Sequence, residues 1–127
     1  MRILGIDYGE KKSGLAAAQN GLVEPLLVLK TKELSLWIAK KDKEEKIEKI
    51  VLGLPGGALN QKIKTFGEEL KKALSIKVEF FGEDLTTLDA QKILGKIKRK
   101  RNYKKRMEDA VAAAIMLESY LERRKNV

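Results

Sequence analysis

Three carboxylates stand where they could act together. Asp7 directly follows the apolar run 3–6, Glu83 comes just after a second apolar run that ends at Gly82, and Asp109 lies in the first turns of an alanine-rich helical segment. A lone buried carboxylate is costly, so each is expected at the end of its element, facing solvent or a cation. Converging carboxylates repel one another unless a divalent cation joins them, and Mg²⁺ or Mn²⁺ prefers oxygen ligands. The pattern predicts that Asp7, Glu83 and Asp109 are catalytic metal ligands, of the kind that supports phosphodiester cleavage.

Each carboxylate also has a purely structural interpretation. Asp7 with Gly9 could form a tight turn in which the carboxylate bonds its own backbone. Glu83 and Asp109 could each favour the dipole at a helix start. For each carboxylate considered alone, the structural interpretation is about as well supported as the metal-site interpretation. Because all three carboxylates stand at the ends of separate elements, the metal site is favoured.

Composition limits the chemistry and indicates the partner. The chain of 127 residues has no His and no Cys, which excludes a zinc site, a Cys nucleophile and a His base. Its formal charge is +9, which favours a polyanion, nucleic acid before a membrane surface, although such a surface could simply keep the chain soluble. We expect one domain over residues 1–127, a cytoplasmic location and no membrane span. The residues expected to contact a nucleic-acid backbone are Lys11, Lys12, Arg99, Arg101, Lys104, Lys105 and Arg106.

The hydrophobic periodicity predicts a strand meander followed by helix–strand alternation. Asn20-Gly21 is a strong tight-turn signal between two antiparallel strands. The fold class expected is α/β: a five-stranded mixed sheet, with three antiparallel strands and two parallel ones, and helices on both faces. Strands are predicted over 3–6, 13–19, 23–29, 50–52 and 77–81, and helices over 33–49, 61–74, 86–97 and 107–124.

At these residues the sequence resembles the YqgF (RuvX-like) family, which has the RNase H-like fold. The resemblance rests on four segments: MRILGIDYGEKKSG over 1–14, IVLGLP over 50–55, EDLTT over 83–87, and the closing helix from Asp109 to Tyr120. It implies a Mg²⁺-dependent nuclease acting on structured nucleic acid, whose acidic residues correspond to Asp7, Glu83 and Asp109. The family is linked to maturation of the 5′ end of pre-16S ribosomal RNA, and was also proposed to resolve Holliday junctions.

The chain departs from the family pattern at several positions. Gly82 replaces an acidic residue, Asp84 replaces an arginine, Glu10 replaces a threonine, and the loop after Pro55 is short. These departures make a catalytically silent nucleic-acid-binding module the second hypothesis, and a small ATPase of the same superfold a weaker third. Both a monomer and a homodimer are compatible with the sequence; a dimer would favour four-way junctions, and a monomer RNA trimming.

Overall fold

A single mixed sheet organises the molecule. The structure, a computed structural model, describes residues 2–82 and 105–125. The strand order is β3-β2-β1-β4-β5, with β1–β2 and β2–β3 antiparallel and β1–β4 and β4–β5 parallel. The strands are β1 (Ile3–Asp7), β2 (Lys12–Gln19), β3 (Leu22–Lys30), β4 (Lys49–Leu54) and β5 (Lys77–Gly82).

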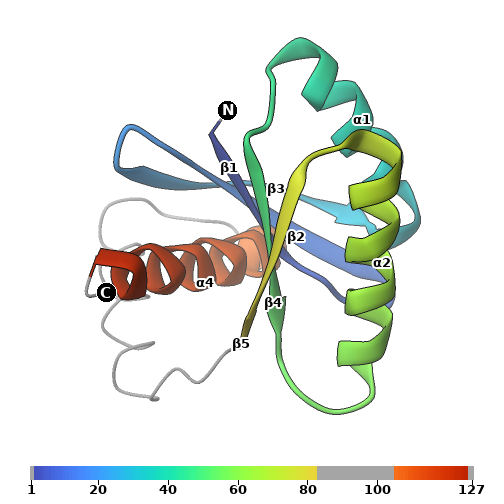
Figure 1. Cartoon of the computed structure of the whole chain (residues 1–127). Coiled ribbons are helices and arrows are strands. Elements are labelled where there is room, and N and C mark those ends of the chain that lie inside the picture. Colours follow the sequence, from blue (N-terminus) through green and yellow to red (C-terminus); the bar gives the residue numbers. More distant parts are fainter. Residues whose placement is uncertain (1, 83–104, 126–127) are drawn as a thin grey trace.

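Helices cover both faces of this sheet (Figure 1). The short 3₁₀ turn η1 (Thr31–Glu33), α1 (Leu34–Glu44) and α2 (Leu59–Leu74) belong to one side, and α4 (Glu108–Lys125), preceded by the 3₁₀ turn η2 (Lys105–Met107), covers the other. The predicted fold class is confirmed. The predicted helix over 86–97 lies outside the described residues. Within residues 2–82 and 105–125, no helix is long and apolar enough to cross a bilayer.

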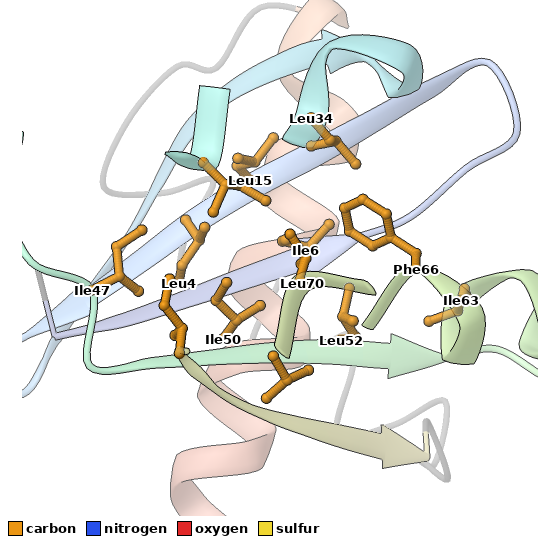
Figure 2. Close-up of a cluster of buried hydrophobic side chains, with 13 residues drawn as sticks. Leu4, Ile6, Leu15, Leu34, Ile47, Ile50, Leu52, Ile63, Phe66 and Leu70 are labelled. Atoms are coloured by element: carbon orange, nitrogen blue, oxygen red, sulfur yellow. The ribbon is translucent and has the colours of Figure 1, made fainter. Parts of the chain in front are cut away.

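Successive side chains of each strand point to opposite faces of the sheet, and the buried side chains therefore form two core clusters, one on each face. Leu4 and Ile6 of β1 enter the cluster beneath α1 and α2, together with Leu15 of β2. Figure 2 shows these side chains in one cluster with Phe66 and Leu70 of α2. The opposite face of the sheet carries small residues, and Ala113, Ala114 and Leu117 of α4 pack against it. Residues at odd positions of β1 therefore face α4, because successive strand side chains alternate between the two faces.

Local sequence signals explain the meander. Asn20 and Gly21 both adopt positive φ, at 54° and 81°, as the predicted two-residue hairpin turn requires. Pro25 lies in β3, an edge strand, beside an irregularity in the β2–β3 register. A missing backbone donor is tolerated at such a position.

The predicted helix over 33–49 is too long at its C-terminus. Helix α1 ends at Glu44, and the Asp42 carboxylate accepts a 2.8 Å hydrogen bond from the Ile47 backbone N–H. Lys49 then begins β4, where it pairs with Ile3. Helical composition in this segment is overridden because strand pairing and burial of Ile47 and Ile50 stabilise the extended backbone.

Candidate active site at the carboxyl edge of the sheet

Asp7 is the last residue of β1 and lies on the α4 side of the sheet. Gly5, two residues earlier, faces α4 so closely that an added Cβ would lie 3.1 Å from the Cβ of Leu117. Alternation places Asp7 on that same face. The side chain is half-buried, at the edge where the parallel strands β1, β4 and β5 all end. This is the edge of an α/β sheet where ligand sites collect.

Gly14 brings the backbone of Asp109 next to Asp7. Gly14 is the register partner of Asp7 across β1 and β2. A Cβ at Gly14 would lie only 1.9 Å from the carbonyl oxygen of Asp109 and 2.5 Å from the backbone nitrogen of Ala110. The first turn of α4 therefore lies directly on β2, and Gly14 permits a contact that any side chain would block. The backbones of Asp7 and Asp109, 102 positions apart in the chain, are thus brought to neighbouring places at this edge.

Asp109 has a cation beside it. Its carboxylate lies 3.5 Å from the ammonium of Lys12, with 35% of the Asp109 side chain exposed. The first helical turn also favours a negative charge there through the helix dipole. An exposed ion pair of this kind contributes little to stability, so Lys12 can exchange Asp109 for another anion at low cost.

A hydroxyl network fixes the turn that follows Asp7. The Thr31 hydroxyl donates to the carbonyl of Gly9 at 2.6 Å, and it shares a 2.7 Å hydrogen bond with the Ser13 hydroxyl. The backbone N–H of Gly9 donates to the same Ser13 oxygen at 3.2 Å. Ser13 belongs to β2 and Thr31 to η1, so hydrogen bonds tie the turn to two other segments. The position of Asp7 therefore does not depend on the turn alone.

Comparisons with known proteins identify the family of this chain. The family described as "RuvX: Holliday junction resolvase" matches residues 1–123. A protein of Caldanaerobacter subterraneus subsp. tengcongensis named "Putative pre-16S rRNA nuclease" is 35% identical, over 99% of this chain and 99% of its own length. One with the same name from Halothermothrix orenii is 34% identical, over 95% and 94%. The chain belongs to the RuvX family.

Two solved structures support the fold of this RuvX-family chain. Fowlpox virus resolvase in complex with Holliday junction DNA superimposes with a TM-score of 0.63 at 19% identity, covering 95% of this chain and 97% of that one. Thermus thermophilus RuvC with a Holliday junction substrate gives a TM-score of 0.61 at 14% identity, with 95% and 94% covered. At these identities the likeness establishes the RNase H-like fold.

The structure places some of the predicted site residues and leaves others outside its described part. Asp7 and Asp109 are brought together. Glu83 follows Gly82, the last residue of β5, in the sequence, but it lies outside the described residues. The same holds for Arg99, Arg101 and Lys104, and for the side chain of Lys105. Among the predicted nucleic-acid contacts, Lys11, Lys12 and Arg106 are described and exposed.

This RuvX-family chain has neither His nor Cys, so the acidic side chains at this edge are the charged metal donors that it can offer. Asp7 and Asp109 are hard donors of the sort that suit Mg²⁺ or Mn²⁺. Within residues 2–82 and 105–125, no three acidic side chains form a complete cation site. The two carboxylates that are placed fit such an ion, and Glu83 is the third ligand that the sequence predicts.

Glu10, one of the departures from the family pattern, has a partner that sequence reasoning missed. Its carboxylate lies 3.5 Å from the ammonium of Lys62 on α2, and both side chains are well exposed. The added negative charge near Asp7 is thus balanced by a lysine 52 positions away. No local sequence pattern relates these two residues, so only the folded structure identifies the pair.

At the opposite end of the sheet, a polar cluster fastens α4. The Tyr120 hydroxyl donates to the Glu79 carboxylate and accepts from the Lys49 ammonium at 3.0 Å. Lys49 and Glu79 also form a 3.2 Å ion pair whose side chains are 14% and 27% exposed. The hydrogen bond from Tyr120, together with the nearby cations, outweighs burial and lowers the pKa of Glu79. Burial would lower the pKa of Lys49, but its bonds to Tyr120 and Glu79 raise it. This cluster links β4, β5 and α4 and so helps to position the first turn of the helix.

Two hollows of the molecule lie away from the carboxylates. One, of about 360 Å³, lies between the β2–β3 turn and the C-terminal half of α4, with Arg2 and Glu118 in its wall. The other, of about 610 Å³, lies beside Trp37 and Leu22. Neither is lined by Asp7 or Asp109.

Proposed function

We propose that this chain is a metal-dependent endonuclease that hydrolyses phosphodiester bonds in structured nucleic acid, with pre-16S ribosomal RNA as its substrate. The observation that carries the proposal is the contact of the Asp109 backbone with Gly14, the strand partner of Asp7. It gathers two carboxylates at one sheet edge of a chain with a formal charge of +9. The names of the curated relatives supply the substrate.

In this proposal Asp7, Asp109 and Glu83 hold Mg²⁺ or Mn²⁺. A bound divalent ion supplies a water nucleophile near neutral pH and stabilises charge on the phosphate. The chain's own residues fix the ligands: the network of Ser13 and Thr31 holds the turn after Asp7, and the close contact at Gly14 holds Asp109. Lys11, Lys12 and Arg106 attract the phosphate backbone, with Arg99, Arg101, Lys104 and Lys105 in the same role.

A four-way DNA junction is the second candidate substrate. The family description and the two superimposed structures are those of Holliday junction resolvases. Resolution of a junction requires two cuts, and therefore two copies of the chain acting together. A catalytically silent binding module is the alternative function, because Glu10 and Asp84 depart from the family pattern.

The test is cleavage of a pre-16S leader RNA fragment and of a four-way DNA junction, each with Mg²⁺ and with EDTA. Asp7→Asn and Asp109→Asn should each abolish metal-dependent cleavage and leave binding largely intact, because both remove negative charge and keep side-chain size. Glu69→Gln is the matched control, since Glu69 is an exposed carboxylate of α2 away from this edge. Binding without cutting, equal in wild type and Asp7→Asn, would support the silent module instead.

A further inference from the structure

Two lysines lie directly opposite one another next to the candidate site. In the register of β2 and β3, Lys12 pairs with Lys30, at the ends of both strands. Directly opposed residues of antiparallel strands have Cβ atoms about 4.5–5.5 Å apart, and like charges there are destabilising. Both side chains are exposed. The pairing is unfavourable for the chain alone and becomes favourable when an anion lies between the two ammonium groups.

Both lysines are on the α4 side of the sheet. Gly14, two residues along β2 from Lys12, meets the backbone of Asp109, and alternation puts Lys12 on that face. The 3.5 Å ion pair of Lys12 with Asp109 is consistent with this placement of Lys12 on the α4 face. Because opposed strand residues share a face, Lys30 lies there too. Contacts between β3 and η2 bring Arg106 to the same corner.

Lys30 differs from Lys12 in its surroundings. Lys12 has Asp109 as a counter-ion, whereas Lys30 has no ion pair with any residue of the ranges 2–82 and 105–125. Its sequence neighbour Lys32 and the nearby Lys11 are also exposed cations, and the carbonyl of Lys11 accepts a 2.9 Å hydrogen bond from the Thr31 backbone N–H. The corner formed by the ends of β2 and β3 therefore carries several exposed lysines beside the two carboxylates.

The spacing suits the backbone of a nucleic-acid strand. Lys30 is on the second strand from Asp7, a lateral distance of roughly 10 Å at the usual strand separation. A nucleic-acid strand carries about one phosphate per 3.4 Å of helix axis. A strand with its scissile phosphate at Asp7 and Asp109 would therefore present another phosphate at Lys30 within about three nucleotides.

Resting on the nuclease function proposed above, we propose that Lys30 and Lys12 form a phosphate-binding subsite that holds the substrate backbone a few nucleotides from the scissile bond. Phosphate between the two ammonium groups relieves their repulsion and frees Asp109 from Lys12. The subsite reads charge and not base identity, because it contains no group directed at a base edge. Lys30 is thus a substrate-binding residue that the sequence pattern did not single out.

The experiment measures binding without metal, so that no cleavage occurs. Fluorescence anisotropy of a labelled pre-16S leader RNA fragment is recorded in EDTA over a series of KCl concentrations, with wild type, Lys30→Gln, Lys30→Arg and Lys72→Gln. Lys72 is an exposed lysine in the last turn of α2, at the opposite edge of the sheet, and is the charge-matched control. The loss of one phosphate contact should weaken Lys30→Gln binding about 5- to 8-fold at 0.1 M salt and reduce the salt slope by about 0.7–0.9. Lys30→Arg should retain binding, and Lys72→Gln should match wild type.

Thermal unfolding separates a lost contact from a damaged fold. Lys30→Gln removes the repulsion with Lys12, so its melting temperature should equal or exceed that of wild type at low salt. Equal affinity and equal salt slope for Lys30→Gln and Lys72→Gln would overturn the subsite. So would weakening of Lys30→Arg to the level of Lys30→Gln.

The outcome is independent of the cleavage assay. A wild type that cuts RNA, combined with unchanged binding by Lys30→Gln, refutes the subsite alone. A wild type that never cuts, combined with weaker binding by Lys30→Gln, supports the subsite and refutes the nuclease.

Discussion

Replacement of Gly14 by alanine tests the geometry of the site most directly. The new Cβ would lie 1.9 Å from the carbonyl oxygen of Asp109 and 2.0 Å from its carbonyl carbon, whereas ordinary contact begins near 3.4 Å. These are backbone atoms of α4, so no side-chain rotation can relieve the clash. The start of α4 must therefore move away from β2 by about 1.5 Å, the difference between 3.4 and 1.9 Å.

The displacement should affect both stability and activity. Overpacking of a tight contact costs about 1–3 kcal/mol, and a clash of the new Cβ with backbone atoms belongs at the upper end of that range. For a chain of this length the melting temperature should fall by roughly 10 °C. Because Asp109 moves with the helix, the two carboxylates separate, and a misplacement of about 1 Å can cost on the order of 100-fold in rate.

The assay compares Gly14→Ala with two other glycine replacements, by thermal unfolding and by Mg²⁺-dependent cleavage of the leader RNA. At Gly5 the three atoms nearest to the added Cβ all belong to the Leu117 side chain, the first at 3.1 Å, so Gly5→Ala should be milder on both measures. At Gly82 no atom of residues 2–82 or 105–125 lies within 4 Å of the added Cβ, so Gly82→Ala is the stability control. Wild-type stability and rate in Gly14→Ala would refute the close approach of α4 to β2, and with it the juxtaposition of Asp7 and Asp109.

Two further predictions concern the groups that hold the site in place. Glu79→Gln should lower stability by about 1–2 kcal/mol near pH 7, because it removes the charge that Lys49 and Tyr120 bind. The pKa of Glu79 is lowered in the folded chain, so this stabilisation is present above the ordinary pKa of 4.5 and is lost as pH falls through the pKa of the folded chain. The stabilities of mutant and wild type should therefore converge in acid. A difference in stability that persists at pH 3 would contradict the charge-based explanation. Thr31→Val should cost about 1–3 kcal/mol in denaturant unfolding and slow cleavage, because the carbonyl of Gly9 loses its 2.6 Å donor. Thr31→Ser keeps the hydroxyl and should retain both properties; equal losses in the two variants would mean that the methyl group matters instead.

Local signals in the sequence were sufficient for most of the fold. The Asn20-Gly21 turn and the short apolar strand β1 depend on residues close together in the chain, and both are present as predicted. The position of Asp7 at a strand end follows from the same apolar run. The tight packing of α4 against the sheet depends on Gly14 of β2, where an added Cβ would clash with the backbone of Asp109.

Where local propensity competed with long-range pairing, the sequence alone gave a wrong boundary. The segment after Glu44 has helical composition, yet Lys49 belongs to β4 because the parallel ladder with β1 and the burial of Ile50 outweigh helix propensity. Neither effect is visible in a sequence window, since Ile3, the partner of Lys49, is 46 residues away.

The sequence by itself therefore determined which residue types are available: acidic oxygens without His or Cys, on a basic chain, at the ends of predicted elements. Only the tertiary structure decided which of them meet. Asp109 lies beside Asp7 because Gly14 lets a helix backbone touch β2, and Lys30 opposes Lys12 because of the β2–β3 register. Contacts between distant segments depend on packing and strand register, and these are properties of the folded chain as a whole.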